Sequence, residues 1–68
     1  MTQEEFENDL LEFLKDEGGL VFKEQICQWK KKNIEYSDCS LETAFESLLS
    51  QEIVEVTDKG ARAIDKST

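Results

Sequence analysis

Hydrophobic positions in the N-terminal part of the chain recur at the spacing of one helix face. The recurring side chains, three or four residues apart as in an amphipathic helix, are Phe6, Leu10, Phe13 and Leu14. Thr2 and Glu5 form a capping-box pair, whose side chains satisfy free backbone N–H groups at a helix start. Gly18 favours a helix end, because glycine adopts the left-handed conformation without a Cβ penalty. We therefore expect a helix over residues 3–17.

A second helix is expected after a short apolar bridge. Leu20–Phe22 has β character and predicts a stub strand of two or three residues. Residues 23–32 return to helical spacing, with an inner face formed by Phe22, Ile26 and Trp29. Lys30–Lys32 occupy the last turn, where cations stabilise the negative end of the helix dipole. Asn33 suits a left-handed terminating residue, which would let Ile34 fold back on the tryptophan.

The segment 34–39 is expected to be a loop, and a third amphipathic helix follows it. Three side chains can serve as the N-cap of this helix, namely Ser37, Asp38 and Ser40. Over residues 40–51 the apolar stripe consists of Leu41, Ala44, Phe45 and Leu48. The opposite, exposed face is polar and consists of Glu42, Thr43, Glu46, Ser47 and Ser50.

The hydrophobic period changes to two after the third helix. Over residues 53–57, Val54 and Val56 alternate with polar side chains, which predicts a half-buried strand. The residues 58–60 suit a three-residue hairpin loop with glycine in its left-handed position, and residues 61–64 would return as a second strand. A short helix over 58–64, capped by Thr57, is the competing interpretation. We favour the hairpin, because a lone strand would leave its backbone groups unpaired.

The composition fits one small domain over residues 1–68, helix-rich, with 38% hydrophobic and 35% charged residues. No apolar run approaches the roughly 20 residues that span a bilayer. Acidic side chains follow directly on the N-terminus, unlike the basic start of a secretory signal. We therefore expect a cytoplasmic protein that does not enter the membrane.

Catalytic and metal-binding chemistry find little support in the residue types present. The chain has no His and only two cysteines, Cys27 and Cys39, which cannot complete a four-ligand zinc site. A disulfide between them is one alternative; reduced thiols acting as small apolar residues are the other, favoured by a cytosolic environment. No glycine-rich phosphate loop or activated serine is present. We expect no enzyme activity, no cofactor, no metal and no small-molecule substrate.

The order of elements resembles the winged helix-turn-helix superfamily over nearly the whole chain. The segment LETAFESLLSQEIVEVTDKGAR looks like the recognition helix and wing of that superfamily, and LLEFLKDEGG looks like its first helix. The resemblance implies an α+β fold in the order α-β-α-α-β-β, with three helices and a small antiparallel hairpin wing. Many members end the third helix on glycine, where this chain has Gln51-Glu52. A non-glycine residue is therefore expected in a left-handed turn there.

The charge of the third helix departs from the superfamily's usual role in DNA binding. Members that bind DNA place Arg, Lys, Asn or Gln on this helix. Residues 33–58 of this chain hold seven acids and no Lys or Arg, and the formal net charge is −8. Since duplex binding depends on neutralising phosphates, we expect instead a protein-interaction or regulatory module that binds a basic protein surface, with nucleic-acid mimicry as one form.

Candidate interaction residues follow from this expectation. The partner-binding set is Glu42, Thr43, Glu46, Ser47, Ser50 and Tyr36. Tyr36 could equally staple its loop, and the acidic face could be a solvated helix surface. The alternative function is a DNA-binding regulator, with phosphate contacts from Lys30, Lys31, Lys32, Lys59 and Arg62. The three lysines have an equally ordinary role as helix-dipole partners. A monomer or weak homodimer is expected.

Overall fold

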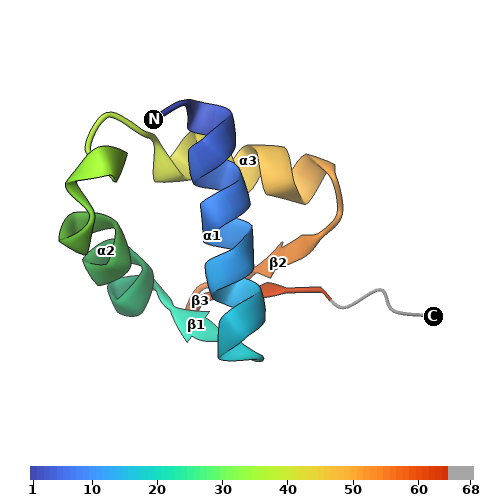
Figure 1. The fold of residues 1–68 in the computed structure, drawn as a ribbon. Helices are drawn as coiled ribbons and strands as arrows, with labels where there is room; N and C mark the ends of the chain where they lie inside the picture. The colour runs from blue at the N-terminus through green and yellow to red at the C-terminus, as the bar shows by residue number, and fades with distance from the viewer. Residues whose placement is uncertain (65–68) are drawn as a thin grey trace.

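Three α-helices and a three-stranded antiparallel sheet make up an α+β fold (Figure 1). The computed structural model describes residues 1–64. Its helices are α1 (Gln3–Glu17), α2 (Lys23–Lys32), the 3-10 turn η1 (Ile34–Tyr36) and α3 (Leu41–Ser50). The bounds of α1 and α2 confirm the prediction, and those of α3 agree to within one residue at each end.

The helix ends show why these bounds were predictable. The Glu5 N–H donates to Thr2 Oγ1 and the Thr2 hydroxyl donates to the Glu5 carboxylate, both at 3.1 Å. Gly18 ends α1 in the left-handed region, with φ of 69°. At α3, Ser40 is the N-cap among the three candidates, because its Oγ accepts from the Thr43 N–H at 3.2 Å. Each cap acts within four residues, so a local pattern suffices to place it.

The hairpin predicted for the C-terminal part is present and has a third strand on its edge. The strands are β1 (Val21–Phe22), β2 (Val54–Val56) and β3 (Gly60–Ala63), in the order β1-β3-β2. Both pairings are antiparallel, with Val21 opposite Ala61 and Val56 opposite the same Ala61. The competing short helix over 58–64 is therefore wrong. The predicted stub strand, β1, pairs with β3 and makes the sheet three-stranded. The predicted wing had only two strands and did not include this pairing.

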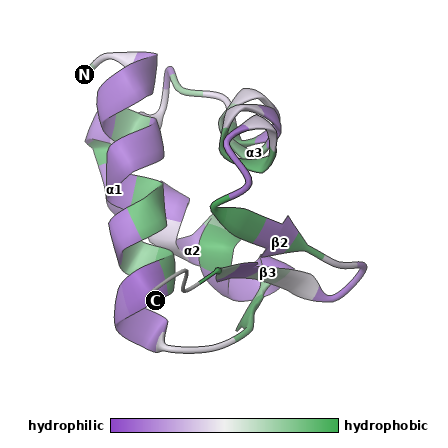
Figure 2. Cartoon of the chain, turned by 90° about the vertical axis from the view of Figure 1, so that its right-hand side faces the viewer, coloured by the Kyte–Doolittle hydropathy of each residue, from purple (hydrophilic) through white to green (hydrophobic). Residues whose placement is uncertain are grey.

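The core lies between the helices and one face of the sheet. Figure 2 shows hydrophobic segments on the sides of α1 and α3 that face inward, and hydrophilic segments outward. The buried side chains come from every element and are Phe6, Leu10, Leu14, Val21, Ile26, Tyr36, Cys39, Ala44, Leu48, Val54 and Ala61. Leu41, Phe45 and Trp29 are partly buried around them. Most of the predicted inner faces are therefore confirmed.

Four local predictions are wrong, each for an identifiable reason. Asn33 is extended rather than left-handed, because its side-chain amide itself donates to the Trp29 carbonyl at 3.1 Å and caps the helix end. Ile34 consequently does not fold back and is 84% exposed. Phe22 points out of the sheet at 53% exposure, because Val21 takes the inward position and strand side chains alternate. Gly60 does not adopt a left-handed φ.

The turn after α3 confirms the prediction of a left-handed non-glycine residue. Glu52 has φ of 59°. Its N–H donates to the Leu49 carbonyl at 3.0 Å, and the Ile53 N–H donates to the Leu48 carbonyl at 3.3 Å. These two bonds form a Schellman ending with glutamate in the position that glycine usually takes. The turn directs the chain from α3 into β2.

Candidate functional site

The start of α3 is fixed to the start of α1 by a pair of reciprocal hydrogen bonds. The Gln3 side-chain amide donates to the Ser40 carbonyl at 2.9 Å, and the Ser40 N–H donates to Gln3 Oε1 at 3.0 Å. On the inner face of α3, the side chains of Ala44 and Leu48 are buried, with at most 2% exposure. The helix is therefore held at its N-terminus and along its inner face, which sets the direction of its outer face.

The outer face of α3 carries the predicted polar residues together. Glu42, Thr43, Glu46 and Ser50 are exposed, and Ser47 is half-buried. Ser47 is partly engaged within the helix, because the Gln51 side-chain amide donates to its hydroxyl and its carbonyl, both at 3.3 Å. We name Glu42, Thr43, Glu46 and Ser50 the acidic face. The structure places these side chains in solvent, where a partner can reach them.

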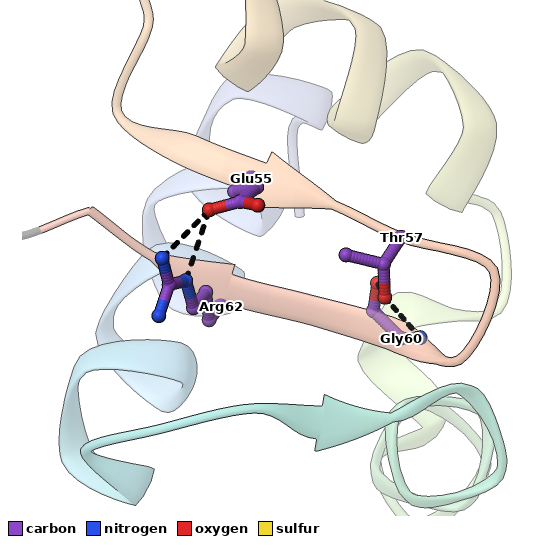
Figure 3. A network of polar contacts seen from close by, with 4 residues as sticks. All are labelled: Glu55, Thr57, Gly60 and Arg62. Carbon is purple, nitrogen blue, oxygen red and sulfur yellow. Dashed lines mark hydrogen bonds and ion pairs between the residues drawn. The ribbon is translucent and has the colours of Figure 1, made fainter.

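The carboxylates of the acidic face have no ion-pair partner among residues 1–64. Within that part of the chain the single ion pair joins Arg62 to Glu55 (Figure 3). Lys30–Lys32, the nearest cationic cluster in sequence, form no ion pair with Glu42 or Glu46. The negative charge of α3 is therefore not cancelled by direct pairing with the described cations.

The predicted phosphate contacts of the hairpin are less available than their sequence positions indicate. Arg62 lies opposite Glu55 in the β2–β3 register. Its Nε and Nη2 both donate to Glu55 Oε2, at 3.0 and 2.8 Å. The pair is exposed and contributes at most about 1 kcal/mol to stability, but it offsets the charge of Arg62. Lys59 is the exposed cation left at the turn.

The lysine cluster of α2 lies far from the hairpin turn. The Lys23 N–H donates to the Lys59 carbonyl at 3.1 Å, so the first residue of α2 contacts the turn. Lys30–Lys32 are at the other end of the helix, about 10–14 Å along its axis from Lys23 at 1.5 Å per residue. The five residues proposed as phosphate contacts are thus divided between the C-terminal end of α2 and the hairpin, and Arg62 is already paired.

Tyr36 belongs to the core rather than to the exposed face. It is 8% exposed, and its hydroxyl donates to Asp9 Oδ2 at 2.9 Å. Its ring packs against Trp29 and Phe6, with centroids 4.7 and 5.1 Å away. Burial first, and then the hydrogen bond to Asp9 and the negative charge of that carboxylate, raise the pKa of Tyr36 to about 12. Of its two anticipated roles, the geometry matches the loop staple, and Tyr36 is not part of the acidic face.

A large apolar residue on α3 was missed. Leu49 is 44% exposed, although its neighbour Leu48 is buried. At about 100° per residue, Leu49 lies about 100° around the helix axis from Leu48 and about 140° from Ala44, toward the polar side of α3. The Leu48-Leu49 pair was therefore a signal in the sequence for an exposed apolar side chain beside the acidic face.

The two cysteines are free thiols in different surroundings. Cys39 is buried, as the sequence suggested, whereas Cys27 is exposed. Within residues 1–64, no three His, Cys, Asp or Glu side chains are grouped so as to hold a metal ion. None of the helices in that part of the chain has the length and apolar character needed to cross a membrane.

Comparisons with known proteins do not extend this picture. No family model, curated protein or solved structure matches the chain. We therefore infer its function from its own geometry and charge.

Proposed function

We propose that the chain is a non-enzymatic interaction module of the winged-helix type, and that its acidic face binds a basic surface of a cytoplasmic protein. The observation that carries this proposal is the exposure of Glu42 and Glu46 without an ion-pair partner in residues 1–64. Positive charge on the partner would raise the rate of association with the acidic face, and the carboxylates would repel proteins whose own surface is acidic. The formal net charge of −8 acts in the same direction over longer range.

The same charge argues against a duplex as the partner of α3. A helix in the major groove lies between two phosphate chains, and affinity comes largely from releasing their counterions. Glu42 and Glu46 would be repelled there. A basic cleft that normally holds nucleic acid is one kind of surface that they fit, since carboxylates and phosphates attract the same arginine and lysine side chains.

Affinity capture with paired charge-reversal variants tests the proposal. The immobilised chain should retain a basic protein from host lysate, and Glu42→Lys with Glu46→Lys should abolish that retention. The matched control is Glu12→Lys with Asp16→Lys, which makes the same charge change at the same spacing on exposed positions of α1. Circular dichroism confirms that both variants fold. Equal loss in the two variants would mean that total charge matters rather than α3.

Binding to a random DNA duplex decides between this proposal and a DNA-binding regulator. Fluorescence anisotropy at low salt is the most permissive condition, because phosphate contacts are strongest there. We expect no saturable binding. Saturable binding that weakens when Lys31 and Lys32 are changed to alanine would identify the lysine cluster as a phosphate site and would contradict the proposal.

A further inference from the structure

An apolar groove opens beside the acidic face. It encloses about 200 Å³ and lies between α2, α3 and the hairpin. Its walls include Ile26 and Cys27 from α2, Leu41 and Phe45 from α3, and Val56 from β2. In Figure 1, α2 lies to the left of α1, and α3 crosses behind α1 above the strands. The groove is smaller than the about 300–1,000 Å³ of typical ligand pockets, and its size suits one side chain of a partner.

The helical periodicity of α3 joins this groove to the acidic face. At about 100° per residue, the order around α3 from the groove outward is Phe45, then Leu49, then Glu42 and Glu46. Leu49 and Val56 are 44% and 38% exposed. Leu49 and the two carboxylates therefore follow Phe45, which lines the groove, around the axis of α3.

We propose that the partner of the acidic face inserts an apolar side chain, flanked by Lys or Arg, into this groove. This inference rests on the proposed function and specifies the chemistry of the partner. The apolar walls select an aliphatic or aromatic anchor, because inserting such a side chain removes the apolar surface of the anchor and that of the groove from water. Glu42 and Glu46 select the flanking cations by charge complementarity.

The charges around the groove also give the partner a direction. Lys23 lines the groove from the α2 side and is the single cation among the described residues that line it. The carboxylates stand on the α3 side. The partner's cations therefore lie on the α3 side of its apolar anchor. A second copy of this chain is disfavoured as the occupant, because each copy carries a net charge of −8.

Cys27 allows the groove to be tested without an identified partner. The thiolate of Cys27 attacks the disulfide of a probe, forms a mixed disulfide with one half and releases the other half as a thiol. Three capped tripeptides serve as the attached halves: Cys-Leu-Lys, Cys-Ser-Lys and Cys-Leu-Glu. Each is titrated with 2-mercaptoethanol, and mass spectrometry of peptides gives the fraction still attached to Cys27. The control protein is Cys27→Ser with Gln28→Cys, which places the thiol on the adjacent exposed position of α2.

The proposal expects an order of retention at Cys27. Cys-Leu-Lys should resist about tenfold more reductant than Cys-Ser-Lys, as burying one leucine side chain implies. At low salt, Cys-Leu-Lys should also stay attached to Cys27 at higher reductant concentrations than Cys-Leu-Glu. The double variant Glu42→Gln with Glu46→Gln should remove this difference between the lysine and glutamate probes. At position 28 all three probes should be equivalent.

Three results would overturn the proposal. Equal retention of the leucine and serine probes would mean that the groove holds no apolar anchor. Equal retention of the lysine and glutamate probes would mean that the carboxylates select no cation. Labelling of Cys27 that slows as protein concentration rises would mean that a second copy covers the groove. Because no partner is used, these outcomes are independent of the capture experiment on the acidic face.

Discussion

Gly60 is a position where the fold has no room for a side chain. A Cβ there would run into the carbonyl oxygen of Val21, with Phe22 Cα 2.9 Å away. The reason is the sheet order, since β1 packs directly against the first residue of β3. The sequence suggested a glycine needed for a left-handed turn, whereas the structure shows a glycine needed for close approach of two strands. The turn itself is held by Thr57. Its Oγ1 accepts from the Lys59 N–H at 3.2 Å and from the Gly60 N–H at 3.3 Å, the second of which Figure 3 shows.

Gly60→Ala should therefore destabilise the fold by about 1–3 kcal/mol, the usual cost of forcing extra volume into a packed site. Gly19→Ala is the matched control, because no atom lies within 4 Å of its added Cβ. That variant should change stability by no more than about 0.5 kcal/mol. Urea unfolding followed by circular dichroism measures both. Equal stability of the two variants would mean that β1 does not pair with β3.

Tyr36 gives the fold a pH dependence at alkaline pH. Its folded pKa of about 12 lies above the ordinary value of 10.0, so the folded state keeps this proton while the unfolded state loses it. The contribution of Tyr36 to the free energy of unfolding is fully present below pH 10.0 and is lost as the pH rises toward 12. Tyr36 is the only tyrosine in the chain. An ultraviolet titration should therefore report its pKa directly, and Tyr36→Phe should remove its part of the alkaline loss. A titration midpoint near 10 would contradict burial of Tyr36.

The bounds of the helices could be predicted from the sequence, whereas the tertiary contacts of their side chains could not. Caps such as Thr2 with Glu5 act between neighbours, so their geometry can be inferred from a short pattern. Tyr36 was misplaced because its partner, Asp9, is 27 residues away. The groove was missed for the same reason, since its walls come from four elements. The exposed face of α3 was anticipated because one helix supplies all of it.

The C-terminal turn of α3 is under strain that a single substitution should relieve. A non-glycine residue in the left-handed region costs about 1–3 kcal/mol, and Glu52 has φ of 59°. Glu52→Gly should raise the free energy of unfolding by about 1 kcal/mol, measured in urea. Glu52→Gln keeps the backbone strain and removes the charge, so it controls for electrostatics. If Glu52→Gln raised the free energy of unfolding as much as Glu52→Gly, the destabilisation would come from the charge of Glu52 and not from its backbone conformation.

Acidic side chains are spread over much of the surface, so the charge of α3 alone does not distinguish it. α1 carries exposed acids as well, including Glu12 and Asp16. What distinguishes α3 is the combination of Glu42 and Glu46 with Leu49 and the apolar groove beside them. A basic partner with an apolar anchor should therefore select α3 over α1, whereas a simple polycation should not discriminate.

The most direct test is a nitrogen–proton NMR titration of the labelled chain with a short amphipathic peptide of leucine and lysine. A peptide with glutamate in place of lysine is the control. We expect saturable shifts confined to the amides of α3 and of residues 26 and 27, which weaken with salt and disappear in Glu42→Lys with Glu46→Lys. Shifts centred on Glu12 and Asp16 of α1, unchanged in that variant, would contradict an interaction surface on α3.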